Sequence, residues 1–470
     1  MEEQAAGERG VTEGSRGAAG LLGRAVDVRA GEIAAMFGGF AYFFFVLSGW
    51  FVLRPIRDAV AAASGVQQLP WLFAGTLTVT LLFNPLFSAL VVRYPVRRFI
   101  PITYHFFIAN LLLFYALLRF APAGEGSVTD LWTGRAFFVW TSVFNMFVVT
   151  IFWSFMADVF RSDQAKRLFG FIGVGGTAGA IVGSALTAAL APRIGAVNLL
   201  LVSAALIEAA VLTVVLFPGP ASRDPRPPTR DPAATTDPTR DVVIGGNVWA
   251  GVTSILRSPY LLAICLFFLL YILGSTVLYF AQSDVVGRFY PDRSSRTAVL
   301  AKLELAAQIL TVLTQLFFTG RIIRWLGLAV TLAILPALSI VGFGTLGALP
   351  VFSTLAIFMV LRRATNFSLT NPAMEVLFTV VPREDKYKAK SFIETFVYRG
   401  SDQLAAWAYA GLAWLGLGLA GIAFAAVPVS VVWLFLALWL GRRQAALAAE
   451  EPRRATGEQT MVAEPHAALS

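Results

Sequence analysis

The feature that most constrains this chain is a series of twelve apolar stretches, each long enough to cross a lipid bilayer. A transmembrane helix needs about 20 apolar residues, because it must cover roughly 30 Å of hydrocarbon while satisfying its own backbone hydrogen bonds. The sequence therefore predicts an all-α membrane protein with twelve transmembrane helices. The expected spans are 34–60, 70–92, 99–118, 136–157, 168–190, 196–217, 260–281, 298–319, 326–346, 351–381, 391–415 and 418–440.

A Pro-rich run of mixed charge, from Ser222 to Pro232, lies between the sixth and seventh spans. It has nothing to bury, and it predicts a flexible cytoplasmic linker. We expect a cytoplasmic N-terminal segment over 1–33, a six-helix bundle over 34–217, the linker over 218–258, a second six-helix bundle over 259–440 and a disordered cytoplasmic tail over 441–470.

Positive charge is unevenly distributed along the chain, which has 37 Lys and Arg and a net charge of +9. Most of these cations fall in the N-terminus, the even-numbered loops and the C-terminus. The positive-inside rule then places both termini in the cytoplasm, and we expect a bacterial inner membrane. The first 33 residues have no apolar core, so we expect no cleaved signal peptide and a first span that acts as the insertion signal. A basic rim of this kind argues against a nucleic-acid partner.

The two halves repeat a pattern after the fourth and the tenth spans. The segments 162–172 and 383–393 share an acidic start, a basic middle and a closing Phe-Ile. This favours two parallel six-helix repeats, which resembles the plan of major facilitator transporters, with alternating access and a substrate site between the halves. In the fifth span, Gly175, Gly179 and Gly183 have a spacing that favours close helix packing over a phosphate-binding loop.

Charged residues within the spans are the first candidates for function, because a charge in hydrocarbon costs at least about 2.5 kcal/mol and normally faces a wet cavity or a partner. Arg54, Arg57 and Asp58 share one face if the first helix continues past Pro55. Guanidinium groups there would suit phosphate or carboxylate. The alternative is that the helix ends at Leu53 and the charges anchor it at the membrane surface.

A second group of polar residues interrupts the tenth span and opens the eleventh. We expect Arg362, Arg363, Asn371 and Glu375 to line a cavity, because lipid contact does not tolerate such polarity. A break at Pro372 would leave carbonyl groups to face that cavity. The further candidates for substrate binding are Lys388, Lys390 and Arg399, and the last of these either pairs with Asp402 or takes part in gating.

Other polar residues give weaker signals. Glu208 in the sixth span has no evident partner, and it is expected to be protonated, paired or part of a proton path. His105 in the third span is expected to be a hydrogen-bonded packing residue. Lys302 and Glu304 are expected at the membrane interface. The chain has no pattern typical of a nucleophilic triad or a nucleotide-hydrolysing loop, so we expect no enzyme, no cofactor, no metal and no obligate protein partner.

Three stretches resemble motifs of the nucleotide transporter family, the ATP/ADP translocases, within the major facilitator superfamily. The first is similar to a Leu-Arg-x-x-Lys-Asp motif of the first helix. The resemblance implies exchange of nucleotides such as ATP for ADP, with Arg57 in place of a first-helix lysine, and Lys388 or Lys390 in place of the basic residue that opens the eleventh helix. The stretches are Leu53-Arg54-Pro55-Ile56-Arg57-Asp58, Phe152-Trp153-Ser154-Phe155-Met156-Ala157-Asp158 with 164–173, and Ser368-Leu369-Thr370-Asn371-Pro372-Ala373-Met374-Glu375 with 384–394.

The chain departs from the family pattern at three places. Neutral residues occupy the fourth-span segment 139–142 and the seventh-span segment 277–280, where the family has carboxylates, and Met374 replaces a lysine. The leading expectation is a secondary transporter of an organic anion, most simply a nucleotide, in contact only with the bilayer and its substrate. The alternatives are a permease for another organic anion, coupled to protons, and a non-transporting membrane protein of the same fold.

Overall fold

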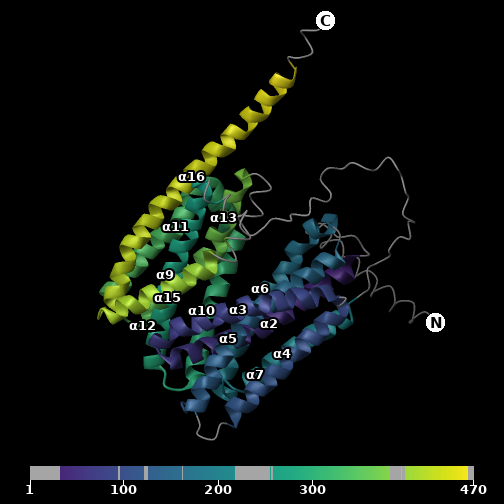
Figure 1. Ribbon diagram of the computed structural model, residues 1–470, viewed down its shortest axis with the longest axis vertical. Coiled ribbons are helices and arrows are strands. Elements are labelled where there is room, and N and C mark those ends of the chain that lie inside the picture. The colour runs from purple at the N-terminus through teal and green to yellow at the C-terminus, as the bar shows by residue number, and fades with distance from the viewer. Residues whose placement is uncertain are drawn as a thin grey trace, which may run out of the picture. The chain divides into compact units, whose positions relative to one another are not determined.

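A computed structural model describes residues 32–93, 96–120, 125–160, 162–217, 258–381 and 397–463, together with Ile255 and Ile393. These residues are helical, with short connections and no strand among them. Figure 1 labels the helices along the chain. Before the linker they are α2 (Ile33–Ser64), α3 (Leu69–Arg93), α4 (Val96–Arg119), α5 (Val128–Val159), α6 (Ser162–Ile194) and α7 (Leu199–Val215). After it they are α9 (Pro259–Phe289), α10 (Arg293–Thr314), α11 (Gly320–Ala348), α12 (Phe352–Thr365), α13 (Asn371–Leu377), α15 (Tyr398–Trp414) and α16 (Leu419–Ala463).

Eight helices of the described part are long and apolar enough to cross a membrane. One of them is a continuous stretch of 56 residues, Arg293–Ala348, which runs through α10 and α11. Helix geometry within this stretch is interrupted at Gly327, whose φ of 74° is open to glycine and strained for other residues. The apolar helix α7 is shorter, at 17 residues.

The last helix, α16, continues to Ala463, past the expected end of the twelfth span at residue 440. A disordered cytoplasmic tail is expected from the sequence over residues 441–470. The segment after Gly441 contains many Ala, Glu, Gln and Arg residues, which have high helix propensity and allow the membrane helix to extend beyond its apolar part.

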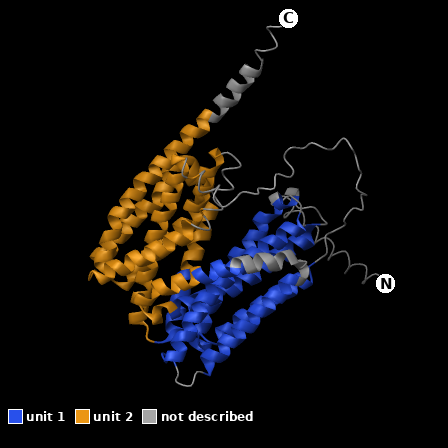
Figure 2. Cartoon of the chain, in the orientation of Figure 1, with its two compact units in different colours: residues 1–60, 78–233, 292–305 blue, residues 61–77, 234–291, 306–470 orange. Residues whose placement is uncertain are grey.

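The chain divides into two compact units, coloured separately in Figure 2. Unit 1 comprises residues 1–60, 78–233 and 292–305, and unit 2 comprises residues 61–77, 234–291 and 306–470. Each unit therefore includes a short segment from the other half of the sequence. The first part of α10 belongs to unit 1 and its last part to unit 2.

Unit 1 is held together by aromatic packing and by close approach of its helices. In Figure 1, α4 lies beside α7, and it also packs against α5. Tyr42, Phe152 and Phe155 are buried at its centre, where Phe43 stacks on Phe152 with ring centroids 4.0 Å apart. Burial of these large rings is the main source of specific packing.

Glycines bring α6 against α2 within unit 1. A Cβ atom at Gly175, Gly179 or Gly183 would overlap the carbonyl oxygen of Phe40, Phe44 or Ser48, respectively. The two helices therefore touch backbone to backbone over two turns, and Ser48 Oγ donates to the Gly179 carbonyl at 3.2 Å. The prediction of close packing is confirmed for this glycine series.

In unit 2, α9, α11 and α16 pack together, and α15 lies along α9. Pro372 lacks an N–H and cannot donate to the Ser368 carbonyl one turn earlier. The chain widens there into a π-helical turn, Asn366–Thr370, and Thr319 Oγ1 donates to the Ser368 carbonyl at 2.8 Å. The Ser368 carbonyl is thus hydrogen-bonded by a side chain of a neighbouring helical turn. From the sequence, such a carbonyl was expected to face a cavity.

Candidate functional site

The charges of α2 lie on a continuous helix. Pro55 is inside α2, which runs on to Ser64, so the alternative in which the helix ends at Leu53 is wrong. Arg54, Arg57 and Asp58 are each partly buried among fully buried neighbours. Continuity past Pro55 is what places Arg57 and Asp58 one helical turn after Arg54.

Arg57 is engaged by its neighbour in the sequence. Its Nη2 and Nε donate to Asp58 Oδ1 at 2.7 Å and 3.0 Å. The guanidinium also lies over the rings of Trp50 and Phe138, with its carbon 5.6 Å and 5.3 Å from their centroids. Cation–π contacts of this kind and the adjacent carboxylate compensate the cost of burying the charge.

Arg54 has a looser environment within the same unit. Its Nη1 lies 3.4 Å from Oε1 of Glu304, which is on α10, and the two side chains are 23% and 5% exposed. The Nε of Arg54 is buried and has no acceptor among the described residues. A guanidinium binds an oxyanion best through two parallel donors, so the Nε edge of Arg54 is a place where an anion can be held.

Helix α10 has a polar face that was not predicted from the sequence. Thr297, Glu304, Gln308 and Thr311 are all buried and recur at helical spacing, although the helix belongs to a membrane span. The signal was present as polar residues at positions i, i+7, i+11 and i+14 of an apolar stretch. Glu304 is therefore a buried carboxylate, and its expected place at the membrane interface stays a prediction.

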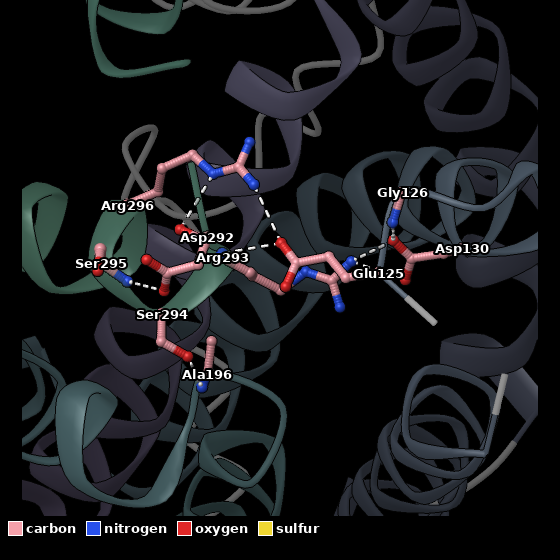
Figure 3. Close-up of polar contacts among 9 residues, drawn as sticks. All are labelled: Glu125, Gly126, Asp130, Ala196, Asp292, Arg293, Ser294, Ser295 and Arg296. Carbon is pink, nitrogen blue, oxygen red and sulfur yellow. Dashed lines mark hydrogen bonds and ion pairs between the residues drawn. The ribbon is translucent and has the colours of Figure 1, made fainter. Parts of the chain in front are cut away.

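A cluster of charged residues fastens the start of α10 to the start of α5 in unit 1 (Figure 3). Arg293 Nη2 lies 2.7 Å from both carboxylate oxygens of Asp130, and both side chains are buried. Asp130 also closes the N-terminus of α5, because its Oδ2 accepts from Gly126 N at 2.9 Å while its own N–H donates to Ser127 Oγ at 3.2 Å. One carboxylate thus serves both a helix cap and an ion pair.

Three further hydrogen bonds strengthen this cluster. Glu125 Oε1 accepts from Arg293 N at 2.8 Å and from Arg296 Nη2 at 3.0 Å. Ser294 Oγ accepts from Ala196 N at 3.0 Å, which adds the connection between α6 and α7 (Figure 3). Sequence reasoning missed these residues, although two arginines in the first turn of a helix oppose its dipole and signal a need for acidic partners.

Arg362 is buried within unit 2, with 5% of its surface exposed. Its Nη1, Nη2 and Nε donate to Ser275 Oγ at 2.8 Å, the Tyr271 carbonyl at 3.0 Å and Ser339 Oγ at 3.3 Å. Its guanidinium carbon lies 5.3 Å from the Tyr271 ring centroid and 5.9 Å from that of Trp433. These contacts join α12 to α9, α11 and α16 and occupy every side of the guanidinium.

The other candidates of this region are not gathered into one group by the described contacts. Asn371 and Glu375 are exposed, and Arg363 and Arg399 are partly buried. Asp402 accepts from Thr276 Oγ1 at 3.5 Å, and no ion pair joins it to Arg399 in the described part of the chain. Lys388 and Lys390 lie outside the described residues.

His105 and Glu208 form a pair between α4 and α7. His105 Nε2 lies 3.2 Å from Glu208 Oε2, and the side chains are 56% and 41% exposed. Glu208 thus has the partner that its sequence context does not reveal, and His105 is paired with a carboxylate on another helix. Among the residues that the structure describes, no group of three or more His, Cys, Asp or Glu is placed to hold a metal ion.

Comparison with known proteins gives a family match and distant relatives. The model of the Major Facilitator Superfamily matches residues 38–401. ADP,ATP carrier protein 1 of Chlamydia pneumoniae is 22% identical over an alignment of 475 positions, gaps included, and the alignment covers 87% of this chain and 90% of that protein. ADP,ATP carrier protein 1 of Chlamydia muridarum is 21% identical over 435 residues, with coverage of 78% and 80%.

Solved structures of transporters have a similar fold. The nucleoside transporter NupG has a TM-score of 0.54 and 14% identity, covering 89% of this chain and 99% of that one. A bacterial homologue of the iron transporter ferroportin, in an inward-facing state, has a TM-score of 0.60 and 12% identity, with the same coverage. At such low identity the likeness shows the fold alone.

Proposed function

Because the chain belongs to the major facilitator superfamily, whose model matches residues 38–401, we propose that it exchanges organic anions of the nucleotide type, such as ATP for ADP, by alternating access. The family and the transporter neighbours make it a secondary transporter of the membrane and not an enzyme. The similarity to ADP,ATP carriers over most of the chain supports the nucleotide part of the proposal.

The proposed architecture has twelve spans in two parallel six-helix repeats, with both termini in the cytoplasm of a bacterial inner membrane. Eight candidate spans become nine if the 56-residue stretch is divided at Gly327. The apolar helix α7, the broken helix α12 to α13, and α15 then supply three more. The cluster in Figure 3 supports this topology, because it brings together three odd-numbered loops that must lie on one side of the membrane.

The environment of Arg54 is the observation that best supports a nucleotide as the substrate. Nucleotides bear several negative charges, and a desolvated phosphate needs cations with directed N–H donors to replace water. Arg54 is partly exposed, holds its acidic partner at 3.4 Å and keeps a buried Nε without an acceptor in the described part of the chain. We propose Arg57 and Asp58 as its neighbours in the site, together with Arg363, Asn371, Glu375, Lys388, Lys390 and Arg399.

Uptake into proteoliposomes tests this function. Vesicles that contain the purified full-length protein are preloaded with ADP or left empty, and the entry of labelled ATP is measured. Strong stimulation by internal ADP is expected for an exchanger. If neither vesicle takes up ATP while other labelled organic anions enter, the nucleotide assignment is wrong and the transport function stands.

A proton-coupled permease for another organic anion is a second candidate. The pair of His105 and Glu208 supports it, because an ionisable pair on membrane helices is a candidate proton site. In that case uptake follows an imposed pH gradient and does not respond to internal nucleotide. Measuring both dependences in the same vesicles separates the two functions.

A further inference from the structure

Two arginine–carboxylate pairs in unit 1 involve the same helix, α10, and they differ in geometry. Both carboxylate oxygens of Asp130 accept a hydrogen bond from Arg293 Nη2, at 2.7 Å each, and both side chains are buried. Glu304 meets Arg54 through one oxygen at 3.4 Å, and the Nε of Arg54 has no acceptor among the residues that the structure describes. Charge-assisted hydrogen bonds at full strength are about 2.7–2.9 Å long. The second pair is therefore a loose one in a place where burial favours a tight one.

Burial makes a counter-ion for Arg54 necessary. A cation taken out of water without a partner is strongly destabilised, and Glu304, only 4% exposed, is the carboxylate placed beside it. A single oxygen at 3.4 Å neutralises the charge without using the two-donor edge of the guanidinium. Such a partner holds the charge while leaving the strongest binding geometry available to another anion.

We propose that Glu304 is an internal counter-ion that the substrate's anionic group replaces on Arg54. The inference rests on the proposed function, and it adds a residue that governs affinity for the anion. In the absence of substrate, Glu304 faces Arg54. When a phosphate or carboxylate of the substrate arrives, it takes both donors of the Arg54 fork, and Glu304 loses its contact because two anions beside one guanidinium repel each other.

This arrangement predicts that Glu304 lowers the affinity of the transporter for its substrate. Removing the charge of Glu304 removes the competitor and leaves Arg54 in need of an anion. A purely structural ion pair predicts the opposite, because damage to the helix contact would weaken binding along with stability. The direction of the change in affinity therefore separates the two roles.

The experiment measures binding of ATP and ADP to the purified full-length protein in detergent, by titration calorimetry, for wild type, Glu304→Gln and Arg54→Gln/Glu304→Gln. We expect Glu304→Gln to bind about tenfold more tightly, equivalent to about 1.4 kcal/mol. The double variant is expected to bind at least tenfold more weakly than wild type. Glu32→Gln, which removes another buried carboxylate paired with an arginine in unit 1, 3.0 Å from Arg167 Nη2, is the matched control and is expected to keep wild-type affinity.

Thermal unfolding gives an independent measurement. Glu304→Gln is expected to unfold at a lower temperature than wild type without ATP and to gain more stability from ATP, because the ligand supplies the missing counter-ion. If this variant does not survive purification, Glu304→Asp shortens the side chain, keeps its charge and is expected to show a smaller change in the same direction.

The outcomes separate the inference from the proposed function. Wild-type binding with unchanged or weaker binding by Glu304→Gln overturns the inference and leaves the function standing. Equal tightening by Glu32→Gln also overturns it, because the effect would then reflect net charge alone. If wild type binds none of ATP, ADP or other organic anions tested, the proposed function fails, and the inference falls with it.

Discussion

Arg293 donates from Nη2 to both carboxylate oxygens of Asp130, at 2.7 Å each, and both side chains are buried in unit 1. Removing one partner of a buried pair leaves a charge uncompensated, which typically costs about 3–5 kcal/mol. Asp130→Asn is therefore expected to lower the unfolding temperature of the purified protein markedly. Asn keeps the backbone N–H that bonds Ser127, so the α5 cap is not the main loss.

A double-mutant cycle checks this coupling. Asp130→Asn/Arg293→Met removes both charges and is expected to be more stable than the sum of the two single changes predicts. Additive losses in the cycle would mean that the pair contributes no coupling energy. Asp284→Asn, which removes the partly buried partner of the exposed Arg288 on α9, is a control expected to stay close to wild type.

Asp292 caps α10 in a pH-dependent way. Hydrogen bonds from the Ser295 hydroxyl and from its backbone N–H, 2.8 Å from Oδ1, hold the pKa of the Asp292 carboxyl below its usual range. A lowered folded-state pKa means that the carboxylate stabilises the folded protein above its unfolded pKa of about 3.9, and that this contribution is lost as pH falls through the lowered value. Asp292→Ala is expected to cost about 1 kcal/mol at neutral pH. Thermal unfolding measured across pH should show this deficit shrinking at low pH.

Gly179 controls the approach of α6 to α2. A larger side chain there would overlap the Phe44 carbonyl, and the two backbones would have to separate. Gly179→Val is expected to lose at least about 1–3 kcal/mol of stability, which size-exclusion profile and thermal unfolding would reveal. Gly173→Ala is the control on the same helix, since nothing lies within 4 Å of its added Cβ, and it is expected to be neutral or slightly stabilising.

Arg362 is expected to support unit 2. Its donors serve Ser275, Ser339 and the Tyr271 carbonyl, and a Lys ammonium cannot reach three acceptors in that planar arrangement. Both Arg362→Met and Arg362→Lys should therefore lower the unfolding temperature. Unchanged stability with a loss of ATP binding would instead return Arg362 to the substrate site.

Arg54 and Arg57 are expected to respond differently to substitution. Arg54→Gln should weaken ATP binding by at least tenfold at modest loss of stability, because its donor edge is available to an anion. Arg57→Ala should abolish uptake, and it should also lower stability, because it leaves Asp58 without its neighbouring cation. Uptake into proteoliposomes, binding titrations and unfolding curves for both variants provide the check. Equal effects on binding and stability in the two variants would contradict this division.

Some of the site is readable from the sequence, and some is not. The spacing of Arg54, Arg57 and Asp58 predicts a common helix face, and continuity of α2 through Pro55 confirms it. From the sequence alone, Arg362 is expected to line a cavity. The residues that contact it lie far away in the sequence, so the sequence around Arg362 does not reveal them. Its neighbours come from positions 271, 275, 339 and 433, and only packing of four helices brings them together.

By itself the sequence determined the class of molecule, because apolar length and the backbone's need for internal hydrogen bonds allow few structures in lipid. It also predicted a close helix contact along the glycine face of α6, since the glycine spacing is local to one helix, and the structure added that α2 is the partner. The pairings of charges that lie far apart in the sequence were decided by the tertiary structure alone. Arg54 meets Glu304 from a position 250 residues away, and Arg293 meets Asp130 across 163 residues, so no local pattern encodes either contact. Coulomb energy depends on distance in space, and the fold sets that distance.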